Sequence, residues 1–245
     1  MISALVPLRS QEVTIAAASD LQFVLPEMAA RFERQTGIKV KLSFGSSGNF
    51  YSQIQNGAPF DLFFSADANY PRSLETDGLV VPGTVYDYAV GKLVLWVPHG
   101  SKLKIEDGLR CLLAPEVARI AIANPAHAPY GRAAQSALRN SGLAEKLKHK
   151  LILGENISQT AQFVQTGSAE AGFLALALAL SPNLKNAGRF VPVDSKLYPP
   201  LLQSAALLKA AREKQAARKF LKFVSNPEGK GLLRQYGFEI PAENR

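Results

Sequence analysis

Hydrophobic and polar positions along this chain follow two different periods, which alternate in short segments. Residues 12–19, EVTIAAAS, form an apolar run typical of a buried strand. From residue 21 to residue 35, apolar positions recur every three or four residues, as they do on one face of a helix. Gly37 stands just beyond this stretch, where helices commonly end. Pro26 lies inside it and removes one N–H donor, so we expect a distorted first turn.

The alternation of strand and helix patterns continues along the whole chain. The predicted strands read KVKLSFG, FDLFFSAD, VGKLVLWVP, RIAIANP, LILG, AEAGFLAL, RFVPV and PLLQSAALLKA. Helices are predicted over SSGNFYSQIQNG, from APYG to Asn140, over QTAQFVQTG and from Glu213 to Val224. Strands that alternate with helices favour an α/β fold with mostly parallel sheets.

Two long apolar strands, VGKLVLWVP and PPLLQSAALLK, are the candidates for the places where the chain passes between two lobes. If the chain crosses there, residues 12–88 form lobe 1, residues 89–196 form lobe 2, and residues 197–245 return to lobe 1. This division follows from the length and order of the strands. A chain of 245 residues is long enough for two modest lobes.

Two strand ends carry small hydroxyl and glycine residues in place of charged ones. AAASD places Ser19 between a strand and a helix, and FGSSGN does the same with Ser47. Ligands of open α/β sheets bind outside the carboxyl ends of strands, where a helix start offers unpaired N–H groups and a positive dipole end. Gly45 and Gly48 would let the backbone approach such a ligand closely. The pattern predicts an anion site of uncharged donors, although for each serine alone helix capping is the commoner role, and Asp20 is another candidate cap.

The second half of the chain offers two further positions at helix starts. NPAHAPYG ends a strand and places Tyr130 at the beginning of the next helix, and GENIS does so with Ile157. Tyr130 is open to two interpretations, a core aromatic residue or a phenol donor to the same anion.

Other chemistry has little support in the sequence. His99, His127 and His149 show no metal-ligand spacing and are interpreted as surface or loop residues. The single cysteine, Cys111, excludes a disulfide framework and a cysteine-based metal site. GSSG is not a G-x-S-x-G nucleophile elbow. Neither the GxxxxGK(S/T) phosphate loop nor the G-x-G-x-x-G dinucleotide fingerprint is present.

Charge changes this interpretation only slightly. The chain has 28 Lys and Arg against 20 Asp and Glu, a formal charge of +8 that attracts anions. The basic residues are spread out or mixed with acids, so we interpret them as solvated helix faces and expect no nucleic-acid partner. No apolar stretch reaches transmembrane length. The start, MISALVPLRSQEV, lacks the basic segment and long apolar core of a complete signal peptide.

Several of these motifs together resemble a known family. AAASDL, FGSSG, QIQNGAPFDLFFSAD, GKLVLW, NPAHAPYG and AGFLALA occur in the order seen in periplasmic molybdate-binding proteins of ABC transporters. The resemblance runs from about Val13 to YGFEIP near the C-terminus, and NGAPFDLFFSAD together with GSSG is its most specific part. It implies the two-lobed fold of type II periplasmic binding proteins, with mixed sheets and two crossing segments as a hinge.

The resemblance also implies a site between the lobes for molybdate or the nearly isosteric tungstate. This site holds the anion by uncharged donors, namely the hydroxyl groups of Ser19 and Ser47, the phenol of Tyr130 and the backbone N–H groups of Asp20 and Ile157, with Ala66 in the pocket wall. The Asp20 carboxylate would repel a dianion, so we expect it to turn away and cap the helix. One branch of the family has a tyrosine where this chain has Ala175. The chain is similar to the other branch, in which the phenol comes from the position of Tyr130.

The function that the resemblance implies is that of a receptor and not of an enzyme. A periplasmic monomer without a cofactor would capture the oxoanion and deliver it to the membrane permease of an ABC transporter. A site that offers only donors should reject anions that stay protonated, because a ligand O–H would lose its partner there. Sulfate matches in charge and shape, so a receptor for sulfate, thiosulfate or another small oxoanion is the first alternative. The others are a serine hydrolase that uses Ser19 or Ser47 and a cytoplasmic anion sensor.

Overall fold

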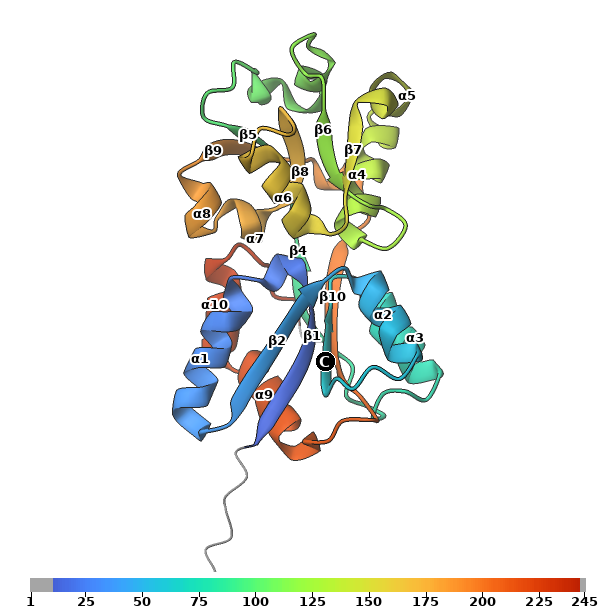
Figure 1. The fold of residues 1–245 in the computed structure, drawn as a ribbon, viewed down its shortest axis with the longest axis vertical. Coiled ribbons are helices and arrows are strands. Elements are labelled where there is room, and N and C mark those ends of the chain that lie inside the picture. Colours follow the sequence, from blue (N-terminus) through green and yellow to red (C-terminus); the bar gives the residue numbers. More distant parts are fainter. Residues whose placement is uncertain (1–10, 243–245) are drawn as a thin grey trace, which may run out of the picture.

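The computed structural model describes residues 11–242, which fold into two lobes that each contain one five-stranded sheet (Figure 1). The segment Met1–Ser10, which holds most of the start that was examined for a signal peptide, lies outside the described residues. In Figure 1 the lower lobe contains β1, β2 and β10, and the upper lobe contains β5 to β9. Two sheets with flanking helices confirm the predicted α/β class.

Both sheets have the same arrangement of strands. The order in the first sheet is β2 (Lys39–Gly45), β1 (Glu12–Ala18), β3 (Leu62–Ser65), β10 (Leu201–Leu207) and β4 (Tyr86–Gly91). The order in the second sheet is β7 (Leu151–Gly154), β6 (Ile120–Ala123), β8 (Ala171–Ala175), β5 (Leu93–Pro98) and β9 (Gly188–Pro192). Only β10 in the first sheet and β5 in the second run antiparallel to their neighbours. The sheets are therefore mixed, as predicted: four of the five strands in each run the same way, and each sheet has two parallel and two antiparallel pairings.

Helices cover both faces of each sheet (Figure 1). Those of the lower lobe are η1 (Ser19–Leu21), α1 (Val24–Thr36), α2 (Ser47–Gln55), α3 (Asn69–Thr76), α9 (Lys214–Ser225) and α10 (Pro227–Gln235). Those of the upper lobe are η2 (Ile105–Leu113), α4 (Pro129–Asn140), α5 (Ala144–Leu147), η3 (Lys148–Lys150), α6 (Ile157–Gln165), α7 (Leu176–Ala179), α8 (Pro182–Lys185) and η4 (Ser195–Leu197). No helix within residues 11–242 combines the length and apolarity that a membrane crossing requires.

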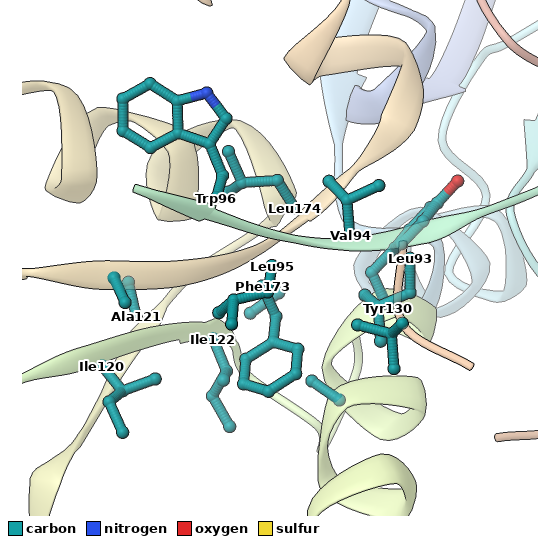
Figure 2. Close-up of a cluster of buried hydrophobic side chains, with 14 of the residues drawn as sticks. Leu93, Val94, Leu95, Trp96, Ile120, Ala121, Ile122, Tyr130, Phe173 and Leu174 are labelled. Carbon is teal, nitrogen blue, oxygen red and sulfur yellow. The ribbon is translucent and has the colours of Figure 1, made fainter. Parts of the chain in front are cut away.

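The central strands are buried on both faces, which explains their continuous apolar sequences. On β1, Ile15 and Ala17 pack into one apolar cluster and Ala16 packs into another, because successive side chains of a strand point to opposite faces. In the upper lobe, the side chains from Leu93 to Val97 on β5 are all buried within one core (Figure 2). Two rigid sheets result, and the loops at their strand ends are held in place by this packing.

The prediction of one continuous strand over VGKLVLWVP is wrong. The run is interrupted at Lys92, and β4 and β5 on either side of this residue belong to different sheets. The Lys92 side chain is partly exposed and pairs with Glu239 at 2.6 Å, which a lysine in the centre of a buried strand could not do. The chain returns to the first sheet between β9 and β10. The lobe boundaries after residues 88 and 196 stay a prediction.

The first helix begins later than the sequence pattern indicates. A short 3-10 turn, η1, follows β1, and α1 begins only at Val24. Pro26 is the third residue of α1, where its missing N–H needs no partner, so the helix accommodates it in the first turn. Gly37 ends the helix with φ of 70°, a left-handed conformation that favours glycine.

Candidate functional site

The predicted site residues meet in one small cavity between the lobes. The carboxyl ends of β1, β2 and β3 in the lower lobe lie opposite those of β6 and β7 in the upper lobe. The cavity is lined by Ala18, Ser19, Asp20, Gly45, Ser46, Ser47, Ala66, Ala128, Pro129, Tyr130 and Ile157. Its volume is about 10 Å³, close to the space that one water molecule needs. All six residues that the resemblance implied are among those lining it.

Two adjacent serines at the start of α2 have different roles. Ser46 is the N-cap, and its Oγ accepts a hydrogen bond of 3.3 Å from the N–H of Asn49. Ser47 is the first residue of the helix, and its Oγ accepts from the N–H of Ala66 at 3.0 Å. The hydroxyl proton of Ser47 therefore remains to be donated. Helix capping, which was one interpretation of Ser47, therefore falls to its neighbour Ser46, and a ligand contact by Ser47 stays a prediction.

The upper lobe presents two helix starts to the cavity. Tyr130 is the second residue of α4 and is 2% exposed, and Ile157 is the first residue of α6. Asn156 caps α6 by accepting from the N–H groups of Ser158 and Gln159, both at 3.0 Å. The N–H of the first helical residue has no partner within its own helix. The backbone of Ile157 is thus placed as a donor at the positive end of the α6 dipole.

The expectation that the Asp20 side chain turns away to cap a helix is wrong. Asp20 is 1% exposed and caps neither η1 nor α1. Its Oδ2 accepts hydrogen bonds from the hydroxyl of Tyr130 at 3.0 Å and from Nε2 of Gln203 at 2.6 Å. Its Oδ1 is buried without a partner among the described residues. Tyr130 donates to Asp20 across the interlobe junction, and Gln203 donates to it from β10 of the same lobe.

Burial dominates the electrostatics of this group. It raises the pKa of Asp20 from 3.8 to about 6, and the hydrogen bonds from Gln203 and Tyr130 oppose the shift only in part. Burial, together with the charge of Asp20, also raises the pKa of Tyr130 and of Tyr88 well above the usual range. Both phenols therefore remain protonated donors at neutral pH.

Two residues that complete this network were missed by the sequence analysis. Gln203 accepts from the Tyr88 hydroxyl at 2.7 Å and donates to Asp20. A Cβ on Gly91 would overlap the Tyr130 hydroxyl, so only glycine leaves room for it. The isolated polar Gln203 in the apolar run LLQSAALL was a usable signal, because a buried amide needs hydrogen-bond partners. Nothing in the sequence pairs Gly91 with Tyr130.

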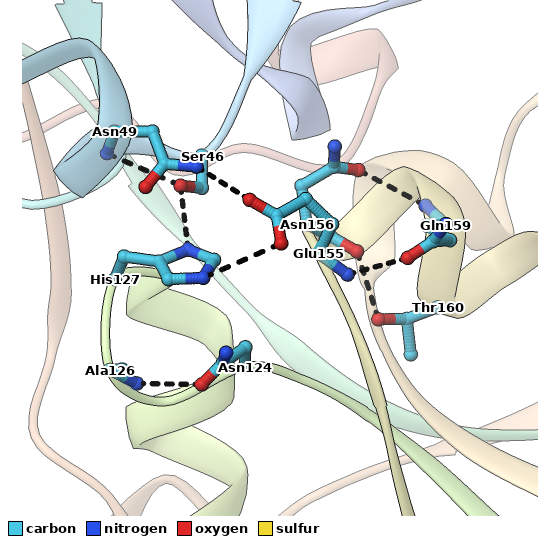
Figure 3. Close-up of polar contacts among 9 residues, drawn as sticks. All are labelled: Ser46, Asn49, Asn124, Ala126, His127, Glu155, Asn156, Gln159 and Thr160. Atoms are coloured by element: carbon cyan, nitrogen blue, oxygen red, sulfur yellow. Dashed lines mark hydrogen bonds and ion pairs between the residues drawn. The ribbon is translucent and has the colours of Figure 1, made fainter. Parts of the chain in front are cut away.

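A second group of polar contacts joins the lobes beside the cavity (Figure 3). The ring of His127 lies in the loop between β6 and α4, and its Nδ1 is 2.8 Å from Oγ of Ser46 in the lower lobe. The carbonyl of His127 accepts from the N–H of Gly48 at 2.9 Å. Glu155, in the loop between β7 and α6, accepts from Asn49 at 2.5 Å and lies 3.7 Å from Nε2 of His127. The loop placement predicted for His127 is correct, but its ring also bridges the two lobes.

The arrangement suits the capture of a small anion by uncharged donors. No Lys, Arg or His is among the residues lining the cavity. Within residues 11–242 there is no group of three His, Cys, Asp or Glu side chains that could hold a metal ion. The histidine near the cavity contacts Ser46 and not Ser19 or Ser47. Two α/β lobes with a donor-lined cavity at their junction define the class of hinged receptors that close around a small ligand.

Comparison with known proteins gives the family. Residues 13–239 match the family of bacterial extracellular solute-binding proteins, and the chain belongs to that family. It is 39% identical over 232 residues to the molybdate-binding protein ModA of Azotobacter vinelandii, covering 95% of this chain and 91% of the relative. The same identity relates it to ModA of Rhodobacter capsulatus, with 95% and 90% covered.

A solved structure agrees with these sequence relatives. The periplasmic molybdate-binding protein of Azotobacter vinelandii superposes with a TM-score of 0.89 at 33% identity, covering 94% of this chain and all of that one. The resemblance indicated by the sequence motifs is thereby confirmed, as is the two-lobed fold that it implied.

Proposed function

We propose that this protein is the substrate-binding receptor of an ABC importer and that it captures molybdate or tungstate between its lobes. The observation that carries the proposal is the convergence of Ser19, Ser47, Tyr130 and Ile157 on one cavity free of basic side chains. Relatives 39% identical over nearly the whole chain are named molybdate-binding proteins, which supports the same ligand here.

The physical basis is the match between a dianion and a shell of donors. A deprotonated tetrahedral oxoanion has only acceptor oxygens, which hydroxyl groups and helix N-termini satisfy without a bulky cationic side chain. In a cavity closed to water each of these hydrogen bonds is stronger than on an open surface. Anions that keep a proton at neutral pH would present an O–H to further donors and bind less well.

The remaining parts of the proposal concern the setting in which the receptor works. We infer that it is secreted to the periplasm, acts as a monomer, needs no cofactor and performs no catalysis. Its partner is the membrane permease that accepts the oxoanion, and it has no nucleic-acid partner. The membership in an extracellular solute-binding family supports the location and the type of partner.

A four-anion comparison tests the ligand. The protein is mixed separately with molybdate, tungstate, sulfate and phosphate, and its thermal unfolding and titration calorimetry are recorded. At about a hundred times its dissociation constant, a ligand adds about 2.7 kcal/mol to the free energy of unfolding. We expect such a shift with molybdate and tungstate. No shift with either anion would sink the proposal, and a larger shift with sulfate would favour the sulfate receptor.

A fluorophosphonate probe tests the alternative of a serine hydrolase. Ser46 contacts Nδ1 of His127, as a serine nucleophile would contact its base, but its Oγ also accepts from Asn49 as the cap of α2. We expect no covalent labelling of any serine in the cavity. Labelling of Ser19, Ser46 or Ser47 that molybdate blocks would contradict a purely binding role.

A further inference from the structure

A carboxylate in a cavity built for a dianion presents an electrostatic conflict. Asp20 lines the cavity with the two serines and Tyr130, is 1% exposed, and leaves the buried Oδ1 without a partner. A bound dianion would place two further negative charges beside it in a medium of low dielectric constant. No cation among the cavity-lining residues offsets that repulsion.

The ionised carboxylate also occupies a donor that the ligand needs. The hydroxyl of Tyr130 points its proton to Oδ2 of Asp20, at 3.0 Å. Gln203 directs its amide to the same oxygen, and Tyr88 in turn donates to Gln203. Both Tyr130 and Gln203 thus donate to Asp20, and Gln203 also donates to the Tyr130 hydroxyl at 3.2 Å. The Tyr130 proton is therefore not available to an anion while the Asp20 carboxylate accepts it.

We propose that the oxoanion binds together with one proton, which Asp20 takes up, and that this proton releases the Tyr130 hydroxyl to the ligand. The inference rests on the proposed function. The proton comes from solvent and forms one O–H bond on the Asp20 carboxylate, and no other bond changes. The neutral acid donates where the carboxylate only accepted, and the Tyr130 hydroxyl rotates from Asp20 to an oxygen of the ligand.

The surroundings of Asp20 favour this exchange. The titratable groups that face it are Tyr130 on α4 and, through Gln203 of β10, Tyr88 on β4. Both tyrosines stay protonated, since burial raises the pKa of each. The other elements around the cavity, α2 and α6, contribute serines and Ile157, which carry no charge. Asp20 is therefore the group in this cavity whose charge responds to a second anion.

Titration calorimetry in buffers of different ionisation enthalpy measures the protons taken up with the ligand. Molybdate is titrated into the wild-type protein at about pH 8, with tungstate as a second probe. We expect uptake of close to one proton per anion and an affinity that falls about tenfold for each pH unit between about pH 7 and about pH 9. In the Asp20→Asn variant we expect no uptake and an affinity independent of pH over the same range.

Two further variants test whether another residue, and not Asp20, takes up the proton. His127→Gln tests the histidine beside the cavity and should keep the uptake of one proton. Tyr130→Phe should bind molybdate more weakly and should also keep the uptake of one proton. Uptake by Asp20→Asn equal to that of the wild type, or loss of uptake in His127→Gln, would overturn the assignment to Asp20.

Infrared difference spectra of the wild-type protein provide a readout that needs no variant. Binding of molybdate should add the carbonyl band of a protonated carboxylic acid, and the absence of that band would also overturn the inference. Binding of molybdate with no proton uptake at all rejects this inference alone. Failure to bind either anion at any pH rejects the proposed function itself.

Discussion

At the scale of single residues, the cavity depends on which hydrogen-bond capacity each side chain has left. Ser47 already uses its oxygen to accept from Ala66, so its proton is free for a ligand. Tyr130 is held by Asp20 and contributes its proton only when the carboxylate releases it. The Ser47 hydroxyl can therefore donate to a ligand at any time, whereas the Tyr130 hydroxyl can donate only after Asp20 has released it.

Ser47→Ala and Tyr130→Phe should each weaken molybdate binding by about 1 kcal/mol or more, since each removes one donor to a buried anion. Titration calorimetry measures the effect. The matched controls are Ser52→Ala and Tyr51→Phe on the outer part of α2, which should bind like the wild type. Unchanged affinity in both cavity variants would place the ligand elsewhere.

Asp20→Asn should raise the free energy of unfolding of the ligand-free protein at pH 8. The pKa of Asp20 is 3.8 ordinarily and about 6 in the fold, so between these values the folded chain binds more protons than the unfolded chain. Stability then falls as pH rises through this window and stays reduced above it. The gain in the variant should reach at most about 3 kcal/mol and vanish near pH 4.

Urea denaturation at several pH values measures this gain, with the exposed Glu116→Gln as a control that should show none. A variant that is less stable than the wild type at pH 8 would mean that the hydrogen bonds to the carboxylate outweigh the cost of burying its charge.

At the scale of elements, the start of α2 is packed against the opposite lobe. The N–H of Gly48 donates to the carbonyl of His127. A Cβ at Gly48 would lie 2.7 Å from that carbonyl oxygen and 2.8 Å from the Tyr70 hydroxyl. Glycine is required here by the close approach of the two lobes and not by its backbone conformation, because its φ is not positive.

Gly48→Ala should therefore hold the lobes apart and reduce molybdate affinity by about 1–3 kcal/mol, the usual cost of overpacking. Calorimetry measures the affinity, and circular dichroism checks that the variant is folded. Gly231→Ala in α10 is the control, because no atom lies within 4 Å of its added Cβ. It should keep the affinity and gain about 0.5–1 kcal/mol in stability. Equal affinity in the two variants would contradict the role given to Gly48.

At the scale of the whole molecule, polar contacts on both sides of the cavity join the lobes. Glu155 and His127 of the upper lobe contact Asn49 and Ser46 of the lower lobe (Figure 3). Arg132 of the upper lobe pairs with Asp67 of the lower lobe at 2.7 Å. These groups are partly exposed, so each contact contributes little, but together they oppose separation of the lobes.

Glu155→Gln should accelerate dissociation of molybdate by up to about fivefold, because it weakens one interlobe contact, that with Asn49, of about 0.2–1 kcal/mol. Rapid filtration of the labelled complex gives the rate, and the effect should shrink as salt is added. Glu145→Gln, which removes the Lys148 pair within one lobe, is the matched control and should leave the rate unchanged. An unaltered rate in Glu155→Gln would show that these contacts do not hold the lobes together.

The sequence by itself determined the α/β class and most of the elements. The hydrophobic pattern of a helix or strand depends only on its own residues. EVTIAAAS and FDLFFSAD are therefore recognisable as strands before their partner strands in the sheet are known. Strand ends and the family resemblance also predicted six site residues that the fold brings to one cavity, because the carboxyl ends of parallel strands are where α/β sheets bind ligands. The sequence indicated that the run VGKLVLWVP passes between the lobes but not that the strand breaks at Lys92, which only the position of the two sheets shows.

Tertiary structure alone decided what surrounds each site residue. Asp20 was expected to cap a helix because a cap is a local interaction, yet it accepts from Tyr130 and Gln203, which are 110 and 183 residues away. The contact of His127 with Ser46 joins residues 81 positions apart, and the Gly91 backbone leaves room for the hydroxyl of the likewise non-local Tyr130. Local periodicity does not predict such partners, because strand order within a sheet places Gln203 beside Asp20 and the packing of the two lobes places Tyr130 there.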